Sequence, residues 1–371
     1  MILAQVSKII PILYAIVGFG LLILVHELGH FIFCKAFNIH TPTFSIGMGP
    51  TIFQKKIGLT NFRLAAIPLG GYVEIAGLQE VGQGEQKHAQ ANDLTAFRNK
   101  PYWQKIIVLG GGVSFNLIFA YLLFIFLFIT GGIPKTEIKI QSVEKDSPAE
   151  IAGILSGDKV IKIGESDLLN KPELLEKERE SILSGLYQNI KFTVSRNNET
   201  KEITIQIPKS SEQNATIEKT KKGKLGVSFA LSMGEEKEHV PFINAIKHGI
   251  STTNLYITMT LSALKQMFKQ KSLKGVGGPV MIVSQSIDFA KRGLYFLFIF
   301  LAMISISLAI MNLLPLPVLD GGQMVFTTIE AIIGRELPIA VKNYAALGSI
   351  ILLGLLFIYI TYGDILFIRG K

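Results

Sequence analysis

Four long stretches of this sequence contain no charged side chain, and they constrain the fold more than any other feature. They comprise residues 9–25, 106–133, 293–319 and 344–363. The hydrocarbon core of a bilayer is about 30 Å thick, and a helix of about 20 apolar residues can cross it. Backbone polar groups in lipid must be satisfied within the segment, so stretches of this kind must be helical. The sequence therefore predicts an α-helical membrane protein with about four transmembrane helices.

The composition agrees with a membrane protein and excludes other classes. Only 18% of the residues are charged, against about 25% in average soluble domains. The net charge of +9 comes without a basic stripe interleaved with aromatic residues, so nucleic acid is not an expected partner. A single cysteine excludes an internal disulfide framework, and any metal must be bound by histidine and carboxylate side chains.

The distribution of basic residues predicts the orientation in the bilayer. Residues 38–104 form a polar loop rich in lysine and arginine, whereas only Lys8 precedes the first span. Cytoplasmic loops have an excess of such residues, so this loop is expected in the cytoplasm and the N-terminus outside. Four spans then return the C-terminus to the outside.

The first apolar run ends in a candidate metal motif, His26-Glu27-Leu28-Gly29-His30. Residues four apart project from one face of a helix, so two imidazoles can bind one zinc ion, and Glu27 is placed to take a proton from the attacking water. The same pattern occurs by chance in soluble helices. However, ionisable groups in a membrane helix are costly and usually functional, which favours the metal site.

Asp320 is the expected third ligand. A catalytic zinc has three protein ligands and an open position, and Asp320 is the first acid after the third apolar run. A solvated Asp-Gly turn is the alternative interpretation. Cys34 lies one turn beyond His30, too far from His26 to complete a tetrahedron, and is expected to be a small buried residue. The other histidines are expected on the surface: His40, His88, His239 and His248.

Asn116 is the one amide side chain in the second apolar run, and it follows Gly110, Gly111 and Gly112. The glycines permit close helix approach. An asparagine in lipid is expected to face the bundle, either in an interhelical hydrogen bond or as a donor to substrate.

The cytoplasmic loop contains a β-region. Phe44, Ile46 and Met48 alternate so as to share one strand face, and residues 61–65 form a second strand that ends at Pro68-Leu69-Gly70-Gly71. A sheet edge beside the metal site could pair with an extended substrate strand. An ordinary cytosolic hairpin is an equal alternative.

Residues 135–232 change character and predict one inserted α+β domain outside the membrane. Its expected elements are strands at 138–143, 159–163, 190–195 and 202–207, a short helix capped by Ser147 with Pro148 at its first position, and a helix at 173–183.

The uncharged segment 249–264 is short for a span, so an interfacial, groove-lining or re-entrant helix is expected there. The predicted segments are 1–37, 38–104, 105–134, 135–232, 233–292, 293–322 and 323–371.

The sequence resembles the site-2 protease family of intramembrane zinc metalloproteases, and within it the bacterial regulator-of-sigma-E protease type. The H-E-x-x-H motif is present from His26 to His30, and the N-x-x-P-x-P-x-L-D-G motif from Asn312 to Gly321. The segments at 44–50 and 67–73 are similar to the family's membrane-associated β-region and the loop after it, 97–101 to the F-x-x-K-P lead-in, and 147–163 to part of a PDZ domain. Val113 stands where the family's G-P-x-x-N motif has proline, and only one PDZ-like domain fits.

The resemblance implies a zinc-dependent protease of the bacterial inner membrane that cleaves single-pass membrane proteins, such as anti-sigma factors or signal-peptide remnants. It implies zinc bound by His26, His30 and Asp320, Glu27 as the base, and substrate or oxyanion contacts from Asn116, Asn312 and the Phe44 to Met48 strand. The PDZ-like domain would bind a new C-terminus or filter substrates by size. A membrane metal transporter and an inactive PDZ scaffold are the alternatives.

Overall fold

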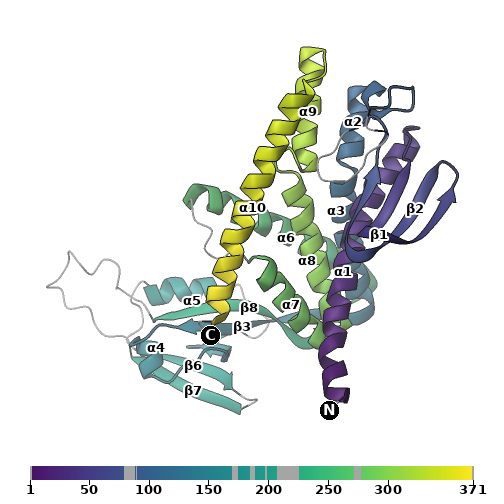
Figure 1. Ribbon diagram of the computed structural model, residues 1–371. Helices are drawn as coiled ribbons and strands as arrows, with labels where there is room; N and C mark the ends of the chain where they lie inside the picture. The colour runs from purple at the N-terminus through teal and green to yellow at the C-terminus, as the bar shows by residue number, and fades with distance from the viewer. Residues whose placement is uncertain are drawn as a thin grey trace. The chain divides into compact units, whose positions relative to one another are not determined.

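The computed structural model describes residues 2–78, 88, 90–168, 174–183, 189–196, 199–206, 225–270 and 277–369. The chain forms two compact units, one built from Met1–Thr130 together with Pro241–Lys371, and the other from Gly131–Val240. The first unit is mostly helical, and a β-sheet dominates the second (Figure 1).

The first unit contains the membrane helices and one β-region. Its elements are α1 (Ile2–Ala36), β1 (Thr43–Ile57), β2 (Thr60–Glu74), the 3-10 helix η1 (Phe97–Asn99), α2 (Tyr102–Leu109), α3 (Gly111–Gly131), α6 (Phe242–Gln270), α7 (Pro279–Lys291), α8 (Leu294–Asn312), α9 (Asp320–Ile333) and α10 (Ile339–Arg369). Among the described residues, four stretches are long and apolar enough to cross a membrane: Ile10–Ala36, Gly111–Gly131, Leu294–Asn312 and Ile339–Leu366. The protein is therefore a multi-pass membrane protein.

The second predicted span is wrong at its ends. It was expected over 105–134, but the helix is interrupted at Gly110 and ends at Gly131. The third segment was expected over 293–322, with its prolines ending or kinking the helix, and α8 ends at Asn312, just before the irregular residues 313–319 that contain Pro315 and Pro317. The absence of charge shows which residues lipid tolerates, but it does not show where the second helix breaks.

The candidate short helix at 249–264 is part of a longer element. It lies inside α6, which runs from Phe242 to Gln270. In α6, Thr253, Thr258 and Thr260 each donate a hydrogen bond to the backbone carbonyl four residues earlier, which satisfies their hydroxyls within the helix. The segment looked short for a span because its uncharged part has only 16 residues and ends at Lys265, but the helix continues through this lysine.

The helices α1 and α3 cross where both have glycine. A Cβ at Gly29 would lie 2.2 Å from the carbonyl oxygen of Gly111, and one at Gly111 would lie 2.7 Å from that of Gly29. Only residues without a side chain allow backbones to approach so closely. This crossing brings the start of α3 against the His26-to-His30 turn of α1. Helix α1 also packs against β2, α7 and α8 (Figure 1).

The β-region has three paired segments rather than the two of a simple hairpin. The segment that contains Phe44 therefore does not lie at a free edge of the sheet, as had been predicted. Thr43 to Ile46 pair with Asn61 to Leu64 on one side and with Gly71 to Glu74 on the other. The predicted end of the second strand at Pro68 is also wrong, because β2 continues to Glu74. The Phe44 segment is therefore an inner strand. The segment from Gly71 to Glu74 lies at the margin, next to α1.

In the described part of the second unit, a six-stranded sheet is accompanied by two short helices. Its elements are β3 (Ile133–Val143), α4 (Pro148–Ile151), β4 (Lys159–Ile163), β5 (Ser166–Asp167), α5 (Leu174–Leu183), β6 (Asn189–Arg196), β7 (Glu199–Gln206) and β8 (Val227–Glu238). The strand order is β7-β6-β4-β3-β8, and β5 pairs with β4. The core contains Ile138, Ile140, Val160 and Phe192 among its buried residues.

The predicted helix cap and one predicted strand of this unit agree with the structure, whereas the start of its first strand and the bounds of the unit differ. Ser147 caps α4 by accepting from the backbone N–H of Glu150, with Pro148 at the first position, and β4 has the predicted bounds. The first strand begins at Ile133 rather than at 138, and the unit extends from 131 to 240 rather than from 135 to 232. The expected ends at Glu173 and Ile207 lie outside the described residues.

A buried ion pair stabilises this unit. The guanidinium of Arg196 donates to both carboxylate oxygens of Asp158 at 2.7 Å, and Asp158 also accepts from the backbone of Leu155. Burial raises the pKa of Asp158, but these hydrogen bonds lower it by more, so it lies below its ordinary value. The pair therefore contributes stability above the unfolded pKa, near 4, and loses it as the pH falls through the folded pKa.

We expect Arg196→Met to destabilise the second unit by about 1–3 kcal/mol at neutral pH, because it removes two of the hydrogen-bond donors to the buried carboxylate of Asp158. Chymotrypsin digestion of the full-length protein across a urea series would measure the effect. Lys191→Met is the matched control, since the Lys191–Glu202 pair in the same sheet is exposed, with its charged atoms 2.7 Å apart, and is worth about 1 kcal/mol at most. The Arg196→Met and unsubstituted proteins should converge in acid. Equal effects of the two substitutions at neutral pH would contradict this prediction.

Candidate metal centre

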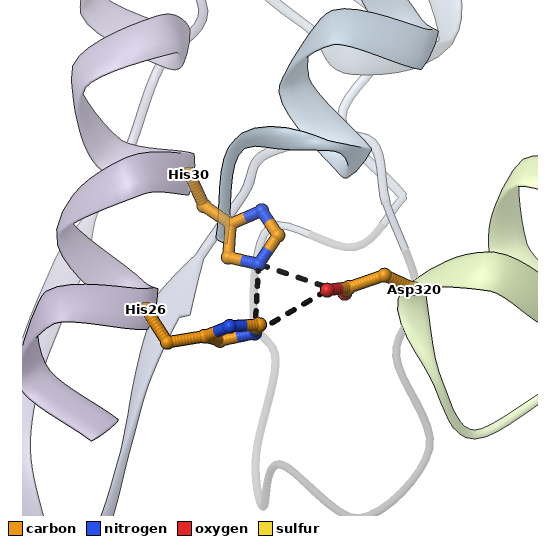
Figure 2. A group of neighbouring side chains, drawn as sticks. All are labelled: His26, His30 and Asp320. Atoms are coloured by element: carbon orange, nitrogen blue, oxygen red, sulfur yellow. Dashed lines mark hydrogen bonds and ion pairs between the residues drawn. The ribbon is translucent and has the colours of Figure 1, made fainter. Parts of the chain in front are cut away.

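Three side chains from distant parts of the sequence converge in the first unit (Figure 2). Nε2 of His26 lies 3.3 Å from Oδ2 of Asp320, and Nε2 of His30 lies 3.5 Å from Oδ1 of the same carboxylate. The two imidazole Nε2 atoms are 3.2 Å apart. All three side chains are largely buried. Within the described part of the chain, these residues form the only group of three or more with metal-ligand spacing.

The spacing of these atoms fits a tetrahedral cation. Ligands about 2.0–2.1 Å from zinc in a tetrahedron lie about 3.3 Å from one another, close to the three separations observed. Among the described residues, no hydrogen-bond donor satisfies the buried Oδ2 of Asp320. Burial raises the pKa of Asp320, but the neighbouring imidazoles hold it well below its ordinary value. Two neutral imidazoles and one carboxylate are a donor set that suits zinc.

The break between α2 and α3 orients the second histidine. Nδ1 of His30 donates to the backbone carbonyl of Val108 over 2.8 Å. Carbonyls in the last turn of a helix do not receive the regular bond from the N–H four residues later, and Val108 is in that turn because α2 ends at Leu109. The interruption that hydropathy could not predict therefore supplies the acceptor that directs Nε2 of His30 towards Asp320.

Gly112 forms the surface against which both imidazoles lie. A Cβ at this position would lie 2.4 Å from Cε1 of His26 and 2.5 Å from Nε2 of His30. No real side chain tolerates such contacts, so a glycine is required here if the two rings are to keep their positions.

Two further glycines place the carboxylate. Asp320 is the first residue of α9, after the irregular residues 313–319. A Cβ at Gly321 would lie 2.3 Å from the carbonyl oxygen of Leu313, and one at Gly322 would lie 2.1 Å from that of Leu316. The irregular segment thus folds tightly over the start of α9. The positive end of the helix dipole also favours a carboxylate at this position.

Glu27 lines the same cavity as the three candidate ligands. The cavity has a volume of about 150 Å³ and is also lined by Val73, Ile75, Asn312, Val318, Leu319 and Gln323. The carboxyl group of Glu27 is hydrogen-bonded to the backbone of Val73 in β2. A carboxylate is therefore placed between the candidate ligands and the marginal strand of the β-region.

The structure separates the residues that were predicted to contact substrate. Asn312 lines the cavity. Asn116 is fully buried and its side chain meets His26 rather than open space, with Nδ2 lying 3.3 Å from Nδ1 of the imidazole. Phe44 is a core residue whose side chain packs against Phe31 and Phe62, and its role in substrate binding stays a prediction.

Ile46 and Met48 are exposed, but the strand that includes Ile46 is paired on both sides. The bulge at Gly47, which has a φ of 85°, breaks the predicted alternation with Phe44. Cys34 is buried, as predicted. His88, His239 and His248 are exposed as predicted, whereas His40 is partly buried and lies edge-on to His88.

Several residues of the cavity were missed by sequence reasoning. Val73 is the last residue of the 67–73 segment that resembles a family loop, and Gln323 follows the L-D-G motif. Both residues therefore lie next to a sequence feature that could have predicted them. Val108 had none, because its contribution is a backbone carbonyl that any residue provides.

Comparison with known proteins places the whole chain in one family. The family model described as peptidase family M50 matches residues 14–356. The chain is 33% identical over 359 residues to a protein of Clostridium perfringens, covering 96% of this chain and 98% of the relative. It is 32% identical to a protein of a Nostoc species, with 93% of each chain covered, and 30% identical to one of Rickettsia conorii, covering 94% of this chain and 97% of the relative. All three are named as presumed zinc metalloproteases.

Proposed function

The chain belongs to peptidase family M50, and from this premise we propose that it is an intramembrane zinc protease of the site-2 type. The convergence of His26, His30 and Asp320 beside Glu27 in one cavity is the observation that supports this function most strongly. The relatives named as zinc metalloproteases support the same cofactor and reaction class.

Each residue of the centre has a role in this proposal. His26 and His30 bind zinc through Nε2, and Asp320 binds it through its carboxylate. Zinc, when bound, supplies a Lewis acid that polarises the scissile carbonyl and acidifies water. Glu27 takes the proton from the attacking water and returns it to the leaving amine. Asn312, which lines the cavity, is positioned to donate a hydrogen bond to substrate.

The margin of the β-region suggests how the substrate is presented. A transmembrane helix hides its carbonyls in intrahelical hydrogen bonds, so it must unwind before hydrolysis. An extended segment can pair with an exposed sheet edge. In our proposal the pairing strand is the Gly71 to Glu74 part of β2, because Val73 contacts Glu27 and the Phe44 strand is already paired on both sides.

The proposed setting is the inner membrane of a bacterium. The lysines and arginines of residues 38–104 favour a cytoplasmic loop, which places the metal centre towards the cytoplasmic side. The Gly131–Val240 unit and both termini would then be extracytoplasmic. The substrates are single-pass membrane proteins, of the anti-sigma-factor or signal-peptide-remnant type that the family resemblance implies.

The second unit is proposed to be a PDZ-like domain that filters substrates by size or binds a newly made C-terminus. Its capped helix α4 and the adjoining strand β4 support this interpretation. The proposal includes one such domain, since the Gly131–Val240 unit has a single sheet among its described residues.

Co-expression with a panel of tagged single-pass membrane proteins, with unsubstituted protein compared with Glu27→Gln, tests the proposed function. We expect at least one shortened product with the unsubstituted protein. We expect its rate of formation to fall about 10²–10⁴-fold with Glu27→Gln, the range of general-base catalysis.

The zinc content of the purified Glu27→Gln protein distinguishes the alternatives. The proposed protease keeps its zinc, because Glu27 is not a ligand. A metal transporter would show zinc-dependent flux that does not need Glu27, and an inactive scaffold would contain no zinc. Absence of any Glu27-dependent product across the panel would refute the protease assignment.

A further inference from the structure

The Nδ1 atoms of the two candidate ligand histidines have different partners. An imidazole that binds a cation through Nε2 uses that lone pair, so its proton must be on Nδ1, which then needs a hydrogen-bond acceptor. For His30 this acceptor is the carbonyl of Val108, 2.8 Å away. A backbone carbonyl can only accept, so His30 is held in the tautomer that binds metal.

The partner of His26 is the amide of Asn116. An amide side chain can present either its nitrogen or its oxygen to a neighbour. In the structure, Nδ2 of Asn116 lies 3.3 Å from Nδ1 of His26, so Asn116 donates and the imidazole accepts. The proton of His26 is then on Nε2, which donates it to Nε2 of His30, 3.2 Å away. Among the described residues, no hydrogen-bond donor reaches the buried Oδ1 of Asn116. This hydrogen-bonding arrangement suits a centre without metal. With its proton on Nε2, His26 is in the tautomer that cannot bind a cation through that atom.

We infer that Asn116 is a positioning residue whose amide selects the tautomer of His26. The amide oxygen and nitrogen have nearly the same shape, so half a turn about the terminal bond replaces the donor by an acceptor within the same space. Oδ1 then accepts from Nδ1–H of His26, and Nε2 is free to bind the cation. This inference rests on the proposed zinc centre.

The hydrogen bond that links α3 to α8 at Asn116 uses its backbone and not its side chain. The hydroxyl of Ser305 in α8 donates to the backbone carbonyl of Asn116 over 2.9 Å, a contact that any residue at position 116 can accept. The close crossing of α1 and α3 is at Gly29 and Gly111. The amide of Asn116, which is fully buried, meets the metal centre through Nδ1 of His26.

Asn116→Asp distinguishes this role from a direct contact with substrate. An aspartate has the same shape as asparagine but two accepting oxygens, so it suits a histidine that must donate from Nδ1. Carboxylate–histidine–zinc arrangements of this kind are common. A donor to the substrate oxyanion would be destroyed by the same change, because an ionised carboxylate cannot donate.

The experiment measures the zinc affinity of the full-length protein in detergent by competition with a chromophoric chelator. We expect Asn116→Leu to weaken zinc binding by about 10–100-fold, the usual effect of losing a residue that orients a ligand. We expect Asn116→Asp to bind zinc at least as tightly as the unsubstituted protein and to retain cleavage. Asn254→Leu is the matched control, because it removes an asparagine from α6 that contacts Tyr121 and not the centre.

Each result decides between the two roles. Unchanged zinc affinity in a folded Asn116→Leu protein would overturn the inference. So would an Asn116→Asp protein that keeps its zinc but loses cleavage, because that pattern belongs to a donor to substrate. If Asn116→Leu does not elute as a single species, the Asn116→Asp measurements decide alone. Failure of the unsubstituted protein to bind zinc would refute the proposed function instead.

Discussion

Asp320→Asn is expected to abolish zinc binding at cellular zinc concentrations, and cleavage with it. The amide keeps the shape of the carboxylate but removes its charge. Four ligands share roughly 10–16 kcal/mol in tight zinc sites, so one ligand accounts for about 3 kcal/mol, or about a hundredfold in affinity. We expect a larger loss here, because the described residues of the centre provide three candidate protein ligands rather than four.

Metal analysis of the purified protein and the same chelator competition would measure this change. Asp288→Asn is the matched control, because Asp288 is an exposed residue of α7 that pairs with Lys291. It should leave zinc content and cleavage unchanged. An Asp320→Asn protein with one zinc per chain at unchanged affinity would show that the carboxylate is not a ligand.

Gly112→Ala is expected to remove zinc binding by adding a single methyl group. The new carbon would lie within 2.6 Å of atoms of both His26 and His30. The rings can move away, since side chains rotate, but only by leaving the positions from which both Nε2 atoms approach Asp320. We therefore expect a folded protein whose zinc affinity falls at least as far as that of Asp320→Asn.

Gly348→Ala is the control for this substitution. Gly348 lies in the membrane helix α10, and a Cβ there would meet no atom within 4 Å. Zinc content, cleavage and elution volume in detergent should all be unchanged. If Gly112→Ala retained zinc and cleavage, the imidazoles would have to bind metal from positions other than those in the structure.

The four uncharged stretches and the H-E-x-x-H motif were sufficient to predict the membrane helices and two of the candidate metal ligands. Helical periodicity alone places His26 and His30 on one face, because the residues are four apart. The membrane setting followed from the absence of charge over four long stretches, because lipid excludes unpaired ionisable groups. The cap of α4 and the bounds of β4 followed from local propensities, which depend only on neighbouring residues.

The break between α2 and α3 and the pairing of the β-region could not be derived in the same way. Pro315 and Pro317 predicted a break after α8, but not that residues 313–319 cover the start of α9 with their carbonyls, a contact that Gly321 and Gly322 allow. The inner position of the Phe44 strand depends on β2 folding back at its far end, a long-range pairing that alternation does not encode.

The sequence by itself determined which residues could bind a metal and in what kind of solvent they would lie. Only the tertiary structure decided that Asp320 reaches the histidines, that Val108 orients one of them and that Asn116 contacts the other. These contacts arise where α1 crosses α3 and where α9 begins. They depend on how closely two backbone segments approach each other, and glycines set that distance because they have no side chain. The sequence shows where the glycines are, but only the packed helices show which backbone each one faces.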